Sequence, residues 1–266
     1  MQYTTHTIIL ALLLILSGCG AKQVESNSVP GTTEVIADET ITTDTTEDPY
    51  LHVHSWQGNL DGKYPVLMWY KEFGDVLTGS LFYTENKKAQ AIRLIGTIKD
   101  KQYRIVEIWP DGKITGIWSL EPHRVGIEGS WISPETGKEF NASMMHIDTA
   151  IEIPVIEVKG DVSGEYAYRY TEDGGWGSMM AKQHGGEVTI RFDNISQAPA
   201  NNLAILDAVT LPLKDNIAIY RSSVFGDCAF RIRFFNDFVV VDYLDNQYDC
   251  GFGNGAGVDG VYIKVK

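Results

Sequence analysis

The stretch Glu187-Val188-Thr189-Ile190-Arg191-Phe192-Asp193 alternates polar and apolar side chains without interruption. Successive side chains of a β-strand point to opposite faces, so the three apolar residues share one face and the four polar residues share the other. A strand with one face on a hydrophobic core and one face in water shows this pattern, and it is typical of antiparallel sheets. The stretch therefore predicts a half-buried antiparallel strand, and its neighbours follow the same rule.

The segment 228–234 repeats the alternation and places Cys228 on the apolar face. Asn236-Asp237 then forms a two-residue turn into the next apolar run, which is a hairpin signal. Glycine, proline and asparagine clusters separate the remaining runs. Eight strands are predicted in this half of the chain, over about 164–171, 177–183, 186–194, 203–211, 216–221, 228–235, 238–244 and 259–265.

The preceding half gives a similar count, and no stretch carries an apolar stripe at helical spacing. Strands are predicted over about 50–57, 64–73, 76–84, 90–99, 102–109, 113–120, 124–132 and 138–146. Within them we expect two sets of side chains each to share a face, namely Ile114, Gly116, Trp118 and Leu120, and then Val125, Ile127, Gly129 and Trp131.

These patterns predict an all-β chain with two consecutive small antiparallel barrels, each a meander of about eight strands. Short connections favour antiparallel pairing of neighbouring strands. Closing each barrel removes its exposed edges. The predicted domains are the first barrel over 49–148, a linker over 149–160, and the second barrel over 161–266.

The N-terminus carries an uninterrupted apolar run over 8–16. A run of about 9 residues is too short to cross a bilayer as a helix, but it fits the core of a signal peptide. Leu16-Ser17-Gly18-Cys19 follows it and resembles the bacterial lipobox, although the leader lacks the usual Lys or Arg. We therefore expect a lipoprotein signal peptide over 1–18, cleavage before Cys19, and lipid such as palmitate on Cys19. The alternative is a secreted protein with an incidental cysteine.

The formal charge is −13, and the segment 20–49 carries seven acidic side chains against one lysine. Residues 19–48 also lack aromatic side chains, so they predict a disordered acidic tether. An acidic chain lacks the basic surface that binding to nucleic acid requires. We expect the protein to contact the membrane through the lipid alone. The outer membrane is the expected location, and either its periplasmic or its external face could carry the protein.

Cys228 and Cys250 remain as an even pair in an oxidising compartment, which predicts a disulfide. The alternative is two buried free thiols.

Candidate metal sites are weak. His52 and His54 lie two apart on a presumed strand, as zinc ligands can, but a solvated pair is the favoured interpretation. Oxygen-bearing side chains surround a glycine-rich loop, and turn chemistry explains them better than calcium. The loop residues 255–260 fit Gly-x-Gly-x-x-Gly without the strand–helix context that a phosphate loop needs. No metal, cofactor or catalytic residue is predicted. The oxygen-bearing set is Asp242, Asp245, Asn246, Asp249, Asn254 and Asp259.

Most aromatic side chains are expected to fill the barrel interiors and leave little room for a substrate cleft. The chain is therefore predicted not to be an enzyme. Trp176 differs because it stands in the glycine-flanked loop 174–177, where it is a candidate contact for a protein partner or a sugar. The alternative is that Trp176 folds back to cap its barrel.

Two stretches resemble uncharacterised lipoproteins of Bacteroidota: residues 79–140, with Leu94-Ile95-Gly96, Glu107, 112–116 and 129–134, and residues 250–262, with Cys250-Gly251-Phe252-Gly253 and 259–262. The resemblance implies fold and location. The second half is also similar to the C-type lysozyme inhibitor family, small eight-stranded barrels with a disulfide. Its inhibitory motif of Ser and Arg/Tyr is matched only by Tyr220-Arg221-Ser222-Ser223 in another order, so no role is carried over.

The function expected from these observations is a non-enzymatic envelope lipoprotein that binds or inhibits a protein or glycan partner. The alternative is a calycin-like carrier of a small apolar ligand, which requires an interior void of about 300 Å³ or more. A glycan hydrolase is the third hypothesis.

Overall fold

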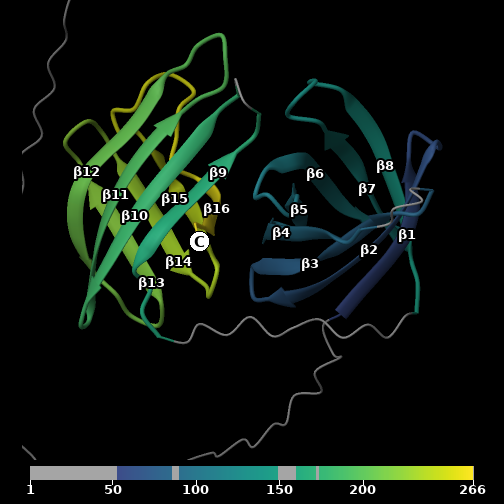
Figure 1. The fold of residues 1–266 in the computed structure, drawn as a ribbon, viewed down its shortest axis with the longest axis horizontal. Coiled ribbons are helices and arrows are strands. Elements are labelled where there is room, and N and C mark those ends of the chain that lie inside the picture. The colour runs from purple at the N-terminus through teal and green to yellow at the C-terminus, as the bar shows by residue number, and fades with distance from the viewer. Residues whose placement is uncertain (1–52, 86–89, 149–159, 172–173, 266) are drawn as a thin grey trace, which may run out of the picture. The chain divides into compact units, whose positions relative to one another are not determined.

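The computed structural model describes residues 53–85, 90–148, 160–171 and 174–265. All regular elements within these ranges are strands, β1 to β16, so the all-β prediction is confirmed (Figure 1). The predicted signal peptide, Cys19, the tether and most of the predicted linker lie outside the described residues. Over the described part of the chain, no helix has the length and hydropathy needed to cross a membrane.

The first eight strands form a closed antiparallel barrel in chain order, sealed where β1 pairs with β8 (Figure 1). Its interior holds Trp118 and Tyr70, both without solvent exposure. The strands are β1 (Val53–Leu60), β2 (Tyr64–Phe73), β3 (Val76–Tyr83), β4 (Ile92–Lys99), β5 (Gln102–Ile108), β6 (Ile114–His123), β7 (Gly126–Ile132) and β8 (Glu139–His146).

The last eight strands form an antiparallel sheet in the order β12-β11-β10-β9-β16-β15-β14-β13. Unlike the first sheet, it is open between β12 and β13. The edge strand β12 ends at Pro212 and exposes Asp207, both features that protect edges from pairing. The strands are β9 (Gly164–Arg169), β10 (Trp176–His184), β11 (Glu187–Ile195), β12 (Leu203–Pro212), β13 (Ile217–Ser222), β14 (Cys228–Phe234), β15 (Phe238–Tyr248) and β16 (Gly260–Lys264).

A β-bulge interrupts the pairing of β5 with β6. Glu107 pairs with Gly116 and Ile108 pairs with Ile114, which leaves Thr115 as the extra residue of β6. A bulge bends its strand and redirects side chains, and such bulges are frequent beside functional sites. Here it lies at the end of the barrel where β5 finishes and β6 begins.

The bulge overturns part of the face prediction. Trp118 and Leu120 point into the first barrel, but Ile114 belongs to a different buried cluster outside it, because the extra residue reverses the alternation. In the second predicted set, Ile127 is buried inside, whereas Val125 is 71% exposed because it lies in the turn before β7. The prediction was wrong for the residues at these strand ends.

The expectation that tryptophans fill the interiors holds only in part. Trp56 and Trp118 are buried in the first barrel core. Trp69 instead stacks on Phe82, with ring centroids 5.0 Å apart, and neither residue belongs to that core. Trp109 is 37% exposed at the end of β5.

The outer faces of the two sheets share a third apolar cluster, and an ionic group accompanies it. Arg231 and Arg233 each form ion pairs with both Asp75 and Asp242. Burial raises the pKa of Asp75, but Arg233 and Arg231 outweigh it and hold that pKa below its usual range. The apolar cluster consists of Val76, Ile95, Val106, Ile108 and Ile114 with Phe238, Val240 and Val261.

Candidate functional site

A hollow of about 560 Å³ opens at one end of the first barrel. It lies where β1 ends at Leu60, β3 ends at Tyr83 and β4 begins at Ile92, so strand ends surround it. The expectation that the interiors are too full to hold a cleft is therefore wrong for this barrel. Five aromatic side chains contribute to the wall, namely Tyr64, Tyr83, Trp109, Trp131 and Phe140.

Glu107 is the polar centre of the hollow and is only 1% exposed. Its Oε1 accepts hydrogen bonds from Tyr83 Oη at 2.7 Å, Trp118 Nε1 at 2.8 Å and Trp131 Nε1 at 2.9 Å. Its Oε2 accepts a longer bond, 3.4 Å, from Thr115 Oγ1. The carboxyl group is thus fixed through one oxygen, and the other oxygen has one weak partner.

The partners of Glu107 are neutral, and this is the unusual property of the site. Buried carboxylates are normally paired with a cation because an isolated buried charge is costly. Within the described residues, no Lys, Arg or His side chain bonds to Glu107. Burial accordingly raises the pKa of the Glu107 carboxyl, and the hydrogen bonds from Tyr83, Trp118 and Trp131 offset only part of that rise.

Gly116 makes room for this arrangement. It faces Glu107 across the β5–β6 pair, and a Cβ atom there would lie 2.2 Å from Trp131 Nε1 and 2.7 Å from the Glu107 carboxyl carbon. Both distances are shorter than van der Waals contact. A glycine is therefore required at this position if the indole and the carboxylate are to meet.

The aromatic wall forms a continuous path from the floor to the mouth of the hollow. Trp131 stacks on Phe140 with ring centroids 5.5 Å apart and planes 16° apart. Phe140 in turn contacts Tyr64, also at 5.5 Å between centroids. Tyr64 is 47% exposed at the start of β2, so the path ends in solvent.

Two charged side chains lie on the rim, in the turn before β6. Asp111 Oδ1 accepts a hydrogen bond from the backbone amide of Lys113, which holds the turn. The Lys113 ammonium pairs with Glu135 at 3.0 Å and is therefore neutralised locally. Because Lys113 and Glu135 neutralise each other, the carboxylate of Asp111 gives the rim an excess of negative charge.

The predicted histidine pair is not assembled into a metal site in the described residues. His52 lies outside them. His54 pairs with Glu72 at 3.4 Å and packs on Tyr70, and His146 meets Trp56 edge-on. In the described ranges, no group of three His, Cys, Asp or Glu side chains is positioned to hold a metal ion.

The oxygen-bearing side chains near the glycine-rich loop have different local roles. Asp242 is engaged by Arg231 and Arg233. Asp245 and Asn246 adopt positive φ angles of 49° and 59° within β15, which is a turn conformation that these residue types tolerate. Backbone geometry therefore accounts for Asp245 and Asn246 at this turn.

Trp176 is the first residue of β10 and is 40% exposed. It does not line the Glu107 hollow but lines a second hollow of about 790 Å³, which Trp109 also lines. Its predicted role as a partner contact remains a prediction.

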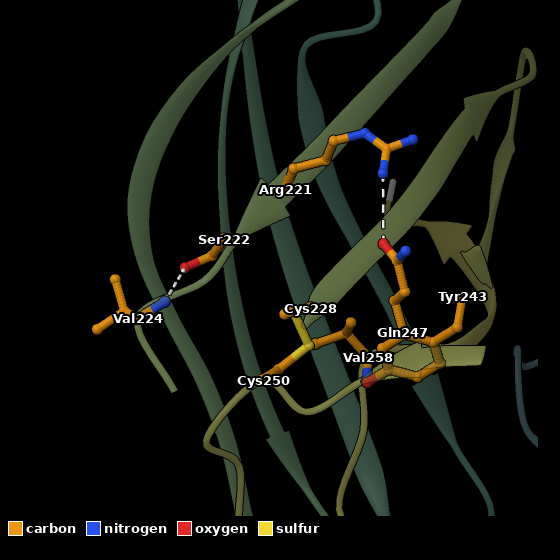
Figure 2. Close-up of a disulfide and its surroundings, with 8 residues drawn as sticks. All are labelled: Arg221, Ser222, Val224, Cys228, Tyr243, Gln247, Cys250 and Val258. Carbon is orange, nitrogen blue, oxygen red and sulfur yellow. Dashed lines mark hydrogen bonds between the residues drawn. A yellow bond between two sulfur atoms is a disulfide. The ribbon is translucent and has the colours of Figure 1, made fainter. Parts of the chain in front are cut away.

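Cys228 and Cys250 are joined as predicted, with Cα atoms 4.7 Å apart. The disulfide lies at the base of the loop between β13 and β14, and the Val224 amide is bonded to Ser222 Oγ (Figure 2). At the tip, Val224 and Phe225 are 77% and 75% exposed. This is an apolar loop on a covalently braced base.

The sequence interpretation did not select Glu107 or Gly116 for a role in a site. The sequence did contain one signal for Glu107, which is a charged residue within the apolar run Ile105-Val106-Glu107-Ile108. Alternation places its side chain on the same face of the strand as that of Ile105, inside the barrel. The three donors to its Oε1 come from β3, β6 and β7, so the site joins residues that lie far apart in the sequence.

No family model matches the chain, and no curated protein matches its sequence. The resemblances to lipoproteins and lysozyme inhibitors stay predictions, and function is inferred from the geometry of the hollow.

Proposed function

We propose that this chain is a lipid-anchored envelope protein that binds a small organic ligand, without converting it, in the hollow of its first barrel. The observation that carries the proposal is the 560 Å³ hollow lined by aromatic side chains around one buried carboxyl group. Ligand sites typically have volumes of about 300–1,000 Å³, apolar walls and a few convergent polar groups. The hollow matches this description in all three respects.

Binding without turnover is supported by the bonding of Glu107. Three donors on one oxygen hold the Glu107 carboxyl group in one position, although burial still raises its pKa. Hydrolysis by paired carboxylates also needs a second acid with its own environment. Asp111, the other acid of the lining, is exposed and already bonded to the backbone. Glu107 is thus suited to hold a ligand group.

Retention of a natural ligand tests this proposal. The chain is isolated from its own envelope without denaturation and weighed by native mass spectrometry, before and after unfolding. We expect a compound bound to the wild type that is absent from Thr115→Phe, because a ring at position 115 enters the hollow. Thr210→Phe, on the exposed face of β12, is the control and should keep the compound.

If the wild type carries no compound, and a chemically diverse panel of small molecules fails to raise its melting temperature, the proposal is wrong. Retention of the same compound by Thr115→Phe would place the ligand elsewhere in the molecule.

The lipid anchor is part of the proposal and has its own test. A palmitate analogue supplied to cells should label the wild type but not Cys19→Ala, and the variant should leave the membrane fraction. Equal labelling of the two would show that Cys19 is not the lipidated residue.

A second candidate function, binding of a protein partner, is favoured by the loop carrying Val224 and Phe225. Exposed apolar residues on a braced loop resemble the anchor residues of inhibitors, which fill pockets in their partners. Replacing both by Ser should abolish capture of a partner from envelope extract while the hollow keeps its ligand. Unchanged capture would remove this loop from consideration.

A further inference from the structure

We propose that the ligand of the first barrel is an organic cation, a protonated amine carried on an apolar body, whose charge pairs with Glu107. This inference rests on the proposed function and names the ligand class of the same hollow. The ammonium group takes the place of the counter-ion that the protein itself does not provide.

The first argument is electrostatic. Glu107 is 1% exposed, and the groups bonded to it are two indoles, one phenol and one threonine hydroxyl. These donors stabilise a carboxylate by hydrogen bonding but supply no opposite charge. An ionised carboxylate accepts through both oxygens without donating, and burial disfavours this form unless a cation lies close to it. A cation in the hollow completes the pair.

The second argument is geometric. Oε1 is saturated by its three partners, whereas Oε2 has only the 3.4 Å bond from Thr115. Both Glu107 and Thr115 line the hollow. An ammonium group placed beside Oε2 can donate to the carboxylate and to the Thr115 hydroxyl oxygen at once, so both polar groups of the floor are satisfied by one ligand group.

The third argument concerns the walls. Indole and phenol rings carry negative charge on their faces and attract cations within about 6 Å of the ring centre. Trp109, Trp131 and Tyr64 all line the hollow. The one cationic side chain of the lining, Lys113, is held at 3.0 Å by Glu135, which reduces its competition for the carboxylate.

The alternatives fit the hollow less well. A fatty acid would place a second carboxylate beside Glu107. A sugar requires several free hydrogen-bonding groups around its ring, whereas polar groups of the lining such as Tyr83, Asp111 and Lys113 are already engaged in bonds of their own.

The test uses three probes that share a phenylpropyl body, namely 3-phenylpropylamine, 3-phenylpropan-1-ol and 4-phenylbutyrate. Their affinities for the full chain are measured by isothermal titration calorimetry. We expect the amine to bind the wild type at least about tenfold more tightly than the alcohol, and the carboxylate to bind most weakly. In Glu107→Gln the amine should lose this advantage, while the affinity for the alcohol changes by less than about threefold.

Glu121→Gln is the matched control, because Glu121 lies on the neighbouring strand β6 and is exposed near the end of that strand. It should keep the wild-type ranking. If Glu107→Gln does not fold, as circular dichroism would show, the ranking of the three probes on the wild type still decides the matter.

Equal or tighter binding of the alcohol or the carboxylate to the wild type overturns the cationic ligand but leaves a small-molecule site in place. Loss of the amine preference in Glu121→Gln would overturn it as well, since the selectivity would not then arise at Glu107. Failure of all three probes to bind overturns the inference too, and the retained natural compound then decides separately whether the hollow is a ligand site.

Discussion

The first barrel closes its sheet and leaves one end hollow, whereas the second leaves its sheet open and fills the space with its own loop. In the second, Val258 is fully buried in the core, and Cys250, Phe252 and Ala256 pack against it. The Gly253 amide also donates to the Leu203 carbonyl at 2.8 Å, so this glycine-rich loop is tied to the edge strand β12.

The buried polar groups show the same contrast. Asn194, in the second barrel, donates to the Gly257 carbonyl at 2.8 Å and to Tyr262 Oη at 2.7 Å. Its partners therefore belong to the loop and the last strand of the same barrel. Glu107 has hydrogen bonds but no counter-ion, and it faces an opening. Similar strand patterning thus yields a core covered by its own loop in one barrel and a core with a hollow at one end in the other.

Truncating a phenylalanine in each barrel should give the largest difference. Phe230 is fully buried and packs on Phe192 and Tyr220. Phe230→Ala should lower the free energy of unfolding by about 3–5 kcal/mol. Phe140→Ala should cost about 1 kcal/mol, because this ring already borders empty space. Guanidinium unfolding measures both, and equal losses would mean that the end of the first barrel is packed.

The disulfide should stabilise the second barrel alone. Cys228 and Cys250 are 22 residues apart in the chain, and closing such a loop contributes about 3 kcal/mol on the chain-entropy model. Replacing both by Ala should increase hydrogen exchange in β13 to β16 and leave β1 to β8 unchanged. Exchange that rises equally in both barrels would show that they unfold as one cooperative unit.

A methyl group added to a glycine should be tolerated in one barrel and resisted in the other. Gly116→Ala places a Cβ against Trp131 and Glu107, so we expect a loss of about 1–3 kcal/mol and of ligand binding. Gly186→Ala, in a turn of the second barrel, meets no atom within 4 Å and should change stability by less than about 0.5 kcal/mol. Thermal unfolding compares the two, and a neutral Gly116→Ala would show that the site is loosely packed.

The pH dependence of Glu107 gives the smallest and most specific effect. Its pKa is raised by burial, so the folded state binds the proton more tightly than the unfolded state. The contribution of Glu107 to the free energy of unfolding is therefore complete below the pKa of the unfolded state. It is lost as pH rises through the pKa of the folded state, by at most about 1.4 kcal/mol per pH unit.

Glu107→Gln removes this titration and serves as the reference. The difference in unfolding free energy, wild type minus variant, should fall as pH rises from about 4.5, the ordinary value for Glu. A difference that rises with pH would mean that the pKa is lowered and that a cation already pairs with Glu107.

Alternation along the strands was sufficient to predict the architecture. The faultless pattern around Ile190 led to antiparallel sheets, because burial of one face fixes the register of a strand. The even pair of cysteines in a chain expected to be exported led to the disulfide. Alternation failed at β6, where the extra residue Thr115 reverses the face of Ile114. A bulge is set by its partner strand, so one strand read alone does not reveal it.

Alternation along single strands could not predict the candidate site either. The site needs Glu107, Trp118 and Trp131 to converge from the neighbouring strands β5, β6 and β7, and their register depends on the bulge at Thr115. The hollow itself depends on where the strands end, since Leu60, Tyr83 and Ile92 at strand ends line it. Composition predicted a full interior because it counts aromatic residues without their positions.

The most direct test of the account follows the indole signals during titration with 3-phenylpropylamine, using ¹H–¹⁵N spectra. Five of the six tryptophans lie in the first barrel, and the Trp131 and Trp118 indoles donate to Glu107. We predict that these two signals move together and saturate, while that of Trp176 stays in place. Saturable movement of Trp176 with Trp131 and Trp118 unchanged would contradict the account.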